Sequence, residues 1–435
     1  MKRLFVVANL HHASPRIPAL TDHLVELGWS VTILSAPLGE NPSYRLGFPE
    51  MFMDRVRVIE VPYPGDVLTV FRKLLIKAGF SSRESFTEQI KEKFGVRRRY
   101  SWVDRALWLY QEIFAFPDGE RTWRIPALKA ASMIMANDRF DIILSSSPYP
   151  TSHVIACSLQ KEFKTKWVAD FRDTWTMNPV YPYSASRQLI ESKFEKHILQ
   201  NASSLITVSD DYANSLRDFH YQTVCVIPNG YQGNLPPISA DYQPKKFILT
   251  YTGSVYLGQQ APEKPLKSIK HLIDKGAIKR DDIEVHFYGR RESWIQNLID
   301  ELDLSDVVIQ YGQIPRQEAR QRQHDSALLL FFNWEDKHNK GLSHLKFYEY
   351  LCTGRLILAT GGHIGSDIEY MLNETRTGFY ARTEDEIEQA LVELYSKFKQ
   401  SGRISYEGKI DVIARYSYHE RAQALNSLLC SLDKS

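Results

Sequence analysis

Apolar and polar positions follow one another along this chain in a pattern that predicts alternating strands and helices. Residues 4–9 form an apolar run, which is typical of a strand buried on both faces of a parallel sheet. Apolar side chains then recur at helical spacing from Ile17 to Leu27, and Gly28 stands where a helix ends. A second strand is predicted over 31–34. This opening predicts a doubly wound α/β sheet that binds its ligand at the carboxyl ends of the strands.

The pattern runs through the chain in two series. Further strands are predicted in the first series over 141–145, 167–170, 205–208 and 224–227. A polar stretch that contains prolines, 236–246, interrupts it. The second series has predicted strands over 247–251, 283–288, 307–311, 327–332 and 356–360. Because a linker followed by a fresh series indicates a second domain, we expect two Rossmann-like doubly wound domains, 1–240 and 241–435, with a cleft between them.

The composition limits the kinds of partner. Hydrophobic residues make up 43% and charged residues 24% of the 435 positions, as in globular proteins. The net charge is only +2, from 54 basic and 52 acidic side chains, so no nucleic-acid partner is expected. The four cysteines are scattered and form no CxxC pair, which favours a reducing cytoplasm over a disulfide framework or a zinc site.

The N-terminus and one aromatic stretch bear on membrane contact. The first apolar run ends after Leu10, and two histidines stand where a signal peptide would need small residues, so a buried strand is the better interpretation. No apolar stretch reaches the roughly 18 residues that span a bilayer. Between 71 and 110, basic residues alternate with aromatic ones, which could touch a membrane surface or an anionic acceptor. Acidic residues in the same stretch favour ordinary amphipathic helices that cover the sheet.

The motifs that are present and absent narrow the chemistry. Helix N-termini in a cleft of this kind offer N–H groups and a positive dipole end to phosphates. However, GxGxxG does not follow the first strand and GxxxxGK[ST] is absent, which disfavours dehydrogenases and P-loop phosphotransferases. A helix predicted within 341–359 projects Lys346 and Glu349 together, because they are three positions apart. A cation there suits a diphosphate and a carboxylate suits ribose hydroxyls, although such pairs are also common on exposed helices.

Several segments, taken in order, resemble the family 4 glycosyltransferases, which are retaining enzymes of GT-B architecture, and more specifically their bacterial cell-surface polysaccharide branch. The resemblance is carried by residues 116–123, 141–153, 168–175, 226–231, 251–254 and 346–360. It implies two facing Rossmann-like domains: an acceptor-side domain over 1–240 and a nucleotide-sugar-binding domain over 241–435. It also implies that the last helices, including 418–432, pack back toward the N-terminal domain.

The resemblance also implies roles for individual residues in the C-terminal domain. Lys346 would contact the donor diphosphate and Glu349 the ribose. Gly253 and Ser254 would form a turn toward the phosphates, where a glycine permits close backbone approach. The other donor-binding residues expected are Lys264, Tyr288, Gly289 and Arg290.

In the N-terminal domain, His153 matches a family histidine near the reacting sugar and is grouped with Lys346 and Glu349 as catalytic. The residues expected to contact substrate are His11, Ser14, Arg16, Asp170, Arg172 and Asp173. Structural roles remain open for two of them. His153 could be a buried histidine with satisfied hydrogen bonds, and Arg172 could belong to a salt-bridge network with its neighbouring carboxylates.

The chain departs from the family at two positions. Gly341 stands where a second glutamate is common, and Gln259 or Gln260 stands where an arginine is common, so Lys264 would have to compensate. We expect a cytoplasmic enzyme, peripheral at the inner face of the membrane if 71–110 binds lipid. It would move a sugar from a nucleotide-diphosphate-sugar donor to a saccharide or lipid-linked acceptor with retention and without metal or other cofactor. A sugar-nucleotide epimerase of the same architecture and a non-catalytic sugar-nucleotide or carbohydrate-binding relative remain alternatives.

Overall fold

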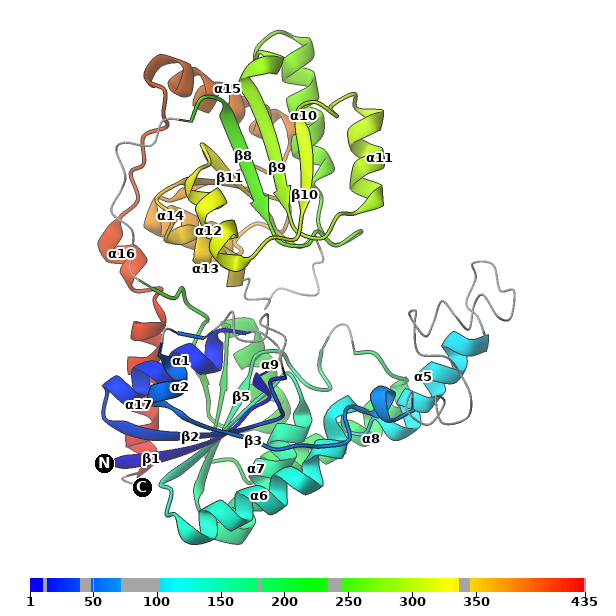
Figure 1. Ribbon diagram of the computed structural model, residues 1–435, viewed down its shortest axis with the longest axis vertical. Helices are drawn as coiled ribbons and strands as arrows, with labels where there is room; N and C mark the ends of the chain where they lie inside the picture. Colours follow the sequence, from blue (N-terminus) through cyan, green and yellow to red (C-terminus); the bar gives the residue numbers. More distant parts are fainter. Residues whose placement is uncertain are drawn as a thin grey trace. The chain divides into compact units, whose positions relative to one another are not determined.

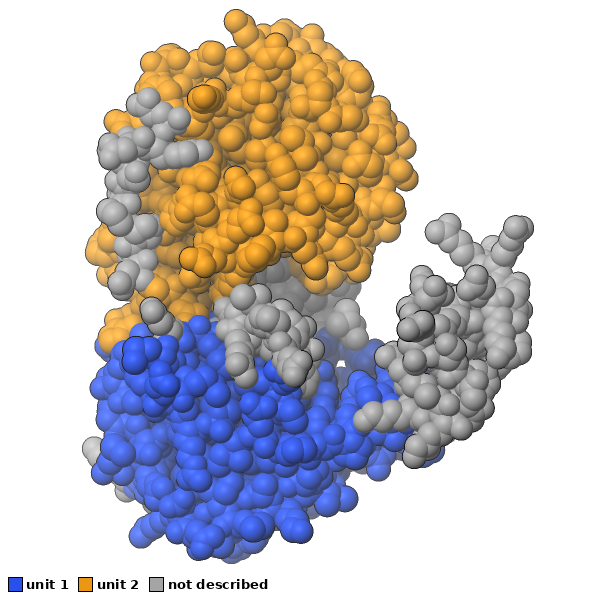
Figure 2. All heavy atoms as spheres, in the orientation of Figure 1, with its two compact units in different colours: residues 1–228, 421–435 blue, residues 229–420 orange. Residues whose placement is uncertain are grey.

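The computed structural model describes residues 1–10, 14–39, 48–49, 51–71, 102–178, 181–233, 244–335 and 345–433. The chain divides into two compact units (Figure 2). Unit 1 comprises residues 1–228 and 421–435, and unit 2 comprises residues 229–420. The predicted domain boundary at 240 falls in 234–243, outside the described residues.

Unit 1 is built on a seven-stranded sheet in the order β3-β2-β1-β4-β5-β6-β7 (Figure 1). The strands are β1 (Lys2–Val7), β2 (Trp29–Ser35), β3 (Arg57–Glu60), β4 (Ile142–Ser146), β5 (Lys166–Phe171), β6 (Ser204–Thr207) and β7 (Val224–Val226). All pairings between them are parallel. The strand order reverses at β1 and β4, which places a ligand crevice beyond the carboxyl ends of these two strands.

The helices of unit 1 follow its strands. They are α1 (Arg16–Glu26), α2 (Phe52–Arg55), α5 (Trp102–Phe114), η3 (Gly119–Trp123), α6 (Arg124–Asn137), α7 (Pro150–Phe163), α8 (Ala185–Leu199) and α9 (Asp210–His220). Residues 421–433 of α17 (Tyr418–Asp433) also belong to unit 1. Asn426 on α17 accepts a hydrogen bond from Trp29 Nε1 at 2.8 Å, and Asp433 pairs with Lys2 at 3.0 Å. The last helix is therefore tied to the first two strands.

Unit 2 has a six-stranded parallel sheet in the order β10-β9-β8-β11-β12-β13. The strands are β8 (Phe247–Thr252), β9 (Ile283–Tyr288), β10 (Val308–Gly312), β11 (Leu328–Phe332), β12 (Leu356–Thr360) and β13 (Gly378–Tyr380). The helices are α10 (Glu263–Asp274), η4 (Arg280–Asp282), α11 (Ser293–Glu301), α12 (Arg316–His324), α13 (Leu345–Leu351), α14 (Asp367–Thr375), α15 (Glu384–Ser401) and α16 (Ile410–Ala414).

Alternation along β11 divides the core of unit 2 into two layers. Leu328, Leu330 and Phe332 pack with apolar residues of α10, α11 and α15. Leu329 and Phe331 point the other way and pack with α13, α14 and α16. Helices therefore cover both faces of the sheet, which explains why central strands such as β11 and β12 appear in the sequence as apolar runs (Figure 1). The two Rossmann-like sheets predicted from the sequence are confirmed.

No helix among the described residues is long and apolar enough to cross a membrane. Of the aromatic and basic stretch 71–110, residues 72–101 lie outside the described residues. The remainder forms the start of α5, where Trp108 and Leu109 are exposed. Contact of this stretch with a membrane stays a prediction.

Candidate functional site

Two glycines bring the carboxyl ends of β8 and β9 together in unit 2. Gly253 follows β8 with a φ of +111°, and a Cβ at this position would lie 2.8 Å from Nζ of Lys346. A Cβ on Gly289, which follows β9, would lie 2.1 Å from the carbonyl oxygen of Gly253. Any side chain at either position would clash, so these positions require glycine. The turn expected to face the phosphates is therefore built around Lys346.

The amine of Lys346 is held close to this turn by a tyrosine. Its Nζ donates a hydrogen bond of 2.5 Å to the phenol oxygen of Tyr251 and lies 3.8 Å from the centre of the same ring. The Tyr251 hydroxyl in turn donates to the carbonyl of Ser254 at 3.0 Å. Burial lowers the pKa of Lys346 to about 7, an effect that the negative charge of Glu349 partly opposes. An amine poised near neutral pH gains a full charge when an anion approaches it.

Glu349 lies one helical turn beyond Lys346 on α13 and has a cationic partner. Arg316, the first residue of α12, donates from its guanidinium to the Glu349 carboxylate. Their side chains are 20% and 24% exposed, so the pair lies at the surface of unit 2 and is only partly hydrated. Sequence reasoning missed Arg316, because no local spacing relates it to Glu349. The structure thus brings Gly253, Lys346 and Glu349 together as predicted and adds Tyr251 and Arg316.

The glutamines that replace the common arginine are part of the scaffold. Gln260 is buried, donates to the carbonyl of Phe332 at 2.7 Å and accepts from the Tyr256 N–H at 3.1 Å. Lys264 lies on α10 and pairs with Glu335 at 2.9 Å. Gln260 therefore fastens the loop after β8 to β11, and Lys264 already has a carboxylate partner.

Tyr288 and Arg290, expected near the nucleotide, lie in different surroundings. The ring of Tyr288 stacks on Tyr311, with centroids 4.8 Å apart and planes 12° apart. Both rings, together with His286 and Arg322, line a cavity of about 410 Å³ beside α12. Arg290 is 71% exposed and pairs with Glu292 at 2.6 Å. A role of either residue in donor binding stays a prediction.

In unit 1, two of the predicted substrate-binding residues bind each other. Arg16 and Asp170 are both fully buried, and the guanidinium reaches the carboxylate at 2.8 Å. Arg16 also donates to the carbonyl of Pro228, and Asp170 accepts from Ser146 Oγ at 2.7 Å. This network links the start of α1 to the end of β5 and to Pro228, which follows β7. It resembles a structural buried pair, and direct contact with substrate stays a prediction.

His153 lies on the first turn of α7 and is fully buried. Trp167 Nε1 donates to Ser145 Oγ at 2.7 Å, and Ser145 Oγ lies 2.8 Å from His153 Nδ1. Among the described residues the Ser145 hydroxyl has no acceptor other than Nδ1, so its proton goes to Nδ1 and the imidazole proton lies on Nε2. Burial lowers the pKa of His153 to about 4, against a smaller raising effect of Asp170, so the ring is neutral. Its Nε2 has no hydrogen-bond partner among the described residues.

The remaining predicted residues of unit 1 cluster around the ends of β1 and β5. The Arg172 N–H donates to Ser147 Oγ at 2.8 Å. Burial raises the pKa of Asp173, and Arg172 opposes this shift. Ser14 Oγ accepts from the Arg16 N–H at 3.4 Å. His11 lies outside the described residues.

Segment 116–123, one of those that carry the family resemblance, has a structural role. The buried Asp118 carboxylate accepts from the Glu120 N–H at the start of η3 and from the Thr151 N–H at the start of α7. It therefore caps two helices at once. Burial raises the pKa of Asp118 to about 6 and that of Glu120 to about 7. Glu120 accepts a hydrogen bond from Tyr63 at 2.5 Å.

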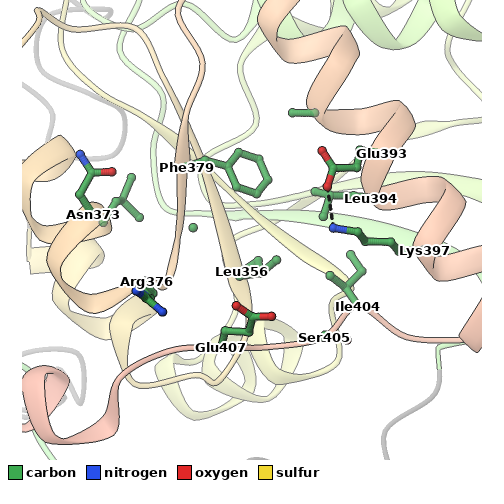
Figure 3. Close-up of a pocket in the computed structure, with 13 residues that line it drawn as sticks. Leu356, Asn373, Arg376, Phe379, Glu393, Leu394, Lys397, Ile404, Ser405 and Glu407 are labelled. Carbon is green, nitrogen blue, oxygen red and sulfur yellow. Dashed lines mark hydrogen bonds and ion pairs between the residues drawn. The ribbon is translucent and has the colours of Figure 1, made fainter.

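A further cavity of about 560 Å³ in unit 2 contains none of the predicted residues (Figure 3). It lies at the amino ends of β12 and β13, beside α15. Phe379 forms part of its apolar floor, and the Glu393–Lys397 ion pair lies at its side. Ligands of doubly wound sheets bind at the opposite, carboxyl edge. We therefore assign the candidate site to the carboxyl edges and not to this cavity.

Comparison with known proteins identifies the class. Residues 13–230 match the glycosyl transferase 4-like domain. This match spans half of the chain, and the chain belongs to this glycosyltransferase family. No curated protein matches the sequence.

Solved structures agree on the fold. The chain is similar to sucrose-phosphate synthase from Thermosynechococcus elongatus (TM-score 0.60, 14% identity, 99% of each chain covered). It is also similar to a glycosyltransferase from Rickettsia africae (TM-score 0.60, 14% identity, 98% of this chain and 97% of the other). A third similar structure is HepE from Anabaena, solved in complex with UDP (TM-score 0.61, 11% identity, 99% of this chain and 100% of the other). These likenesses support two Rossmann-like domains of the GT-B type.

Proposed function

We propose that this glycosyltransferase takes a sugar from a nucleotide-diphosphate-sugar donor and transfers it, with retention of configuration and without metal, to a saccharide or lipid-linked acceptor. The observation that carries the proposal is the half-buried amine of Lys346 packed against the glycine turn of Gly253. A cation at a glycine turn on the carboxyl edge of a doubly wound sheet is suited to a diphosphate.

The low pKa of Lys346 fits the needs of the leaving group. When the glycosidic bond breaks, negative charge builds up on the diphosphate oxygen. Lys346 would bind this oxygen and carry a full positive charge as the charge develops, which stabilises the transition state more than the ground state. The hydrogen bond to Tyr251 holds the amine in place beforehand, so little reorganisation is needed.

Glu349 would recognise the sugar of the nucleoside. Its carboxylate can accept from the two ribose hydroxyls, and the hydrogen bond from Arg316 holds it in orientation. Arg316 itself provides a second cation at the same edge for the phosphates. This cation would offset the positive charge that is missing because Gln259 or Gln260 stands where an arginine is common.

The finer parts of the proposal rest on the family resemblance. They are retention of configuration, the surface polysaccharide product, cytoplasmic location and peripheral membrane contact through 71–110. In a retaining transfer of this kind the leaving phosphate helps to deprotonate the acceptor hydroxyl, so the protein mainly positions the two substrates. His153 would lie near the reacting sugar, and Ser14 and Arg172 would contact substrate.

The test is a panel of UDP-, GDP-, ADP- and dTDP-sugars, screened by thermal shift with wild type, Lys346→Ala and Glu349→Ala. A ligand of the native state raises its apparent stability. We expect one base to stabilise the wild type and Lys346→Ala to abolish the shift. Lys267→Ala, a lysine on the neighbouring α10, is the matched control and should behave as wild type.

The same screen separates the alternatives. Product analysis with the donor that binds should show a new glycosidic bond once acceptors are added. Conversion of the donor sugar without an acceptor would indicate an epimerase. Binding without any turnover would indicate a non-catalytic relative, and no binding by any nucleotide would contradict the proposal.

A further inference from the structure

Asn9 and His153, at the carboxyl end of unit 1's sheet, carry buried polar atoms that have no hydrogen-bond partner among the described residues. Asn9 is 9% exposed, and both Oδ1 and Nδ2 of its carboxamide are unpaired among the described residues. Nε2 of the fully buried His153 is unpaired as well. A buried polar group without a partner destabilises the folded state, and native proteins contain few of them. Such groups indicate a partner that binds from outside the chain.

The strand register places these groups on one face. Val7 on β1 lies opposite Ser145 on β4, and Ser145 is the hydrogen-bond partner of His153. Val7 faces the same apolar layer as the α7 residue Val154. Asn9 is two residues beyond Val7, and the Ala8 N–H still bonds to the carbonyl of Leu34, so the extended conformation continues past β1. Alternation therefore directs Asn9 toward the α7 face that carries His153.

We propose that Asn9, together with His153, binds hydroxyl groups of a pyranose. The inference deepens the proposed function and rests on it. A carboxamide offers both a donor and an acceptor, and the Nε2–H of His153 offers one further donor. Neighbouring hydroxyls of a sugar ring present the complementary alternation of acceptors and donors. No sequence pattern singles out Asn9, because an Asn at a strand end is common and its unpaired state appears only in the fold.

The charged residues beside them cannot take this role as readily. Arg16 and Asp170 bind each other in the interior, and Asp170 also accepts from Ser146. Breaking this pair to bind a neutral hydroxyl would leave a charged side chain buried without its opposite charge. The unpaired neutral groups of Asn9 and His153 carry no such cost. Binding a sugar would instead satisfy them.

The first arm of the test measures stability without ligand. Asn9→Leu keeps the number of side-chain heavy atoms and removes every polar group. Because the carboxamide has no partner to lose, we expect the melting temperature to stay unchanged or rise. Asn333→Leu is the matched control: Asn333 is buried, donates to Tyr380 and accepts from the Trp334 N–H, so its replacement should lower the melting temperature. If Asn9→Leu does not fold, Asn9→Ala replaces it.

The second arm measures binding by calorimetry. The probes are UDP-glucose, GDP-mannose and ADP-glucose, each compared with its own nucleoside diphosphate. If the pyranose is the transferred sugar, Asn9→Leu loses about tenfold in affinity for the nucleotide sugar that binds and none for the bare nucleotide. If the pyranose belongs to the acceptor, the loss appears instead with methyl glucoside, galactoside or mannoside, followed by ligand-observed NMR.

The two proposals fail in different ways. Absence of nucleotide binding by the wild type contradicts the proposed function, while the methyl glycosides still decide the role of Asn9. The inference is overturned if Asn9→Leu melts well below the wild type and binds every probe unchanged. That result would mean a structural amide satisfied by an internal water. It is equally overturned if no probe loses affinity.

Discussion

The amine of Lys346 and the phenol oxygen of Tyr251 lie 2.5 Å apart, although 95 positions separate them in the sequence. Tyr251 is the last but one residue of β8, and Lys346 is the second residue of α13. The contact holds Lys346, the only cationic residue of α13, next to the glycine turn of Gly253. The contact therefore brings the helix that was predicted from the sequence to the carboxyl edge of the sheet.

Replacing Tyr251 by Phe tests whether this contact positions the amine. The ring and its stacking on Phe332 remain, while the acceptor of the Lys346 hydrogen bond is lost. We expect the affinity for the nucleotide sugar to fall about three- to tenfold, less than for removal of the charge itself. Calorimetric titration measures this. The control Tyr395→Phe, a partly buried tyrosine on α15, should leave the affinity unchanged.

Arg316 and Glu349 should be coupled in donor binding. Each single substitution, Arg316→Gln or Glu349→Gln, removes one partner and frees the other, so each should raise the donor KM. If the pair acts as a unit, the double variant is only slightly worse than either single one, with a coupling energy of about 1 kcal/mol. Initial-rate measurements on the four proteins provide the cycle. Strict additivity would mean that Arg316 does not orient Glu349.

Arg16 and Asp170 should matter for folding more than any surface pair. Arg16→Met leaves the Asp170 carboxylate buried and uncompensated, so we expect a loss of about 3–5 kcal/mol in the free energy of unfolding. Urea denaturation measures it. The control is Lys270→Met, which breaks the exposed pair with Asp274 and should cost less than about 0.5 kcal/mol. A large kinetic effect of Arg16→Met at unchanged stability would show that Arg16 instead binds substrate.

Glu120 should make unit 1 more stable in mild acid. Burial raises its pKa in the folded protein to about 7, above the ordinary value of 4.5 that applies in the unfolded chain. Between these values the folded state binds more protons than the unfolded state, so this contribution to stability grows as the pH falls from 7.5 toward 5. Glu120→Gln removes it. The free energy of unfolding, measured with urea, should therefore differ less between pH 7.5 and pH 5.5 in the variant than in the wild type. Equal differences in the two proteins would contradict the raised pKa.

The sequence predicted the central strands well but missed two of the four edge strands. Strands such as β9 and β12 are largely buried, and their predicted bounds agree with those of the structure. β3 (Arg57–Glu60) and β13 (Gly378–Tyr380) were missed. They are four and three residues long at the sheet edges, and neither contains a fully buried residue. β3 and β13 have a weaker apolar pattern because part of each strand is exposed to solvent.

The candidate site was predictable only where it is local. Lys346 and Glu349 follow from helical spacing within one segment. Arg316 and Tyr251 come from α12 and β8, and only the fold brings them to α13. Tyr350, next to Glu349 on the same helix, is likewise placed only by the fold: it is buried, and its hydroxyl accepts the Thr252 N–H at 2.9 Å.

The most direct test of the account is calorimetric titration of the nucleotide sugar that binds, at pH 6.5 and pH 9, into wild type, Lys346→Met and Lys346→Arg. The diphosphate of a nucleotide sugar does not titrate in this range. Because the pKa of Lys346 is lowered to about 7, the amine is neutral at pH 9 in the free protein, and binding must supply its proton.

We therefore expect wild-type affinity to fall by up to about tenfold per pH unit above 7. Lys346→Arg should bind with little dependence on pH, since a guanidinium stays charged. Lys346→Met should bind about 100-fold more weakly than wild type at pH 6.5 and show no such dependence. If Lys346→Met binds the donor as tightly as the wild type at both pH values, Lys346 does not hold the diphosphate, and the account of this site is wrong.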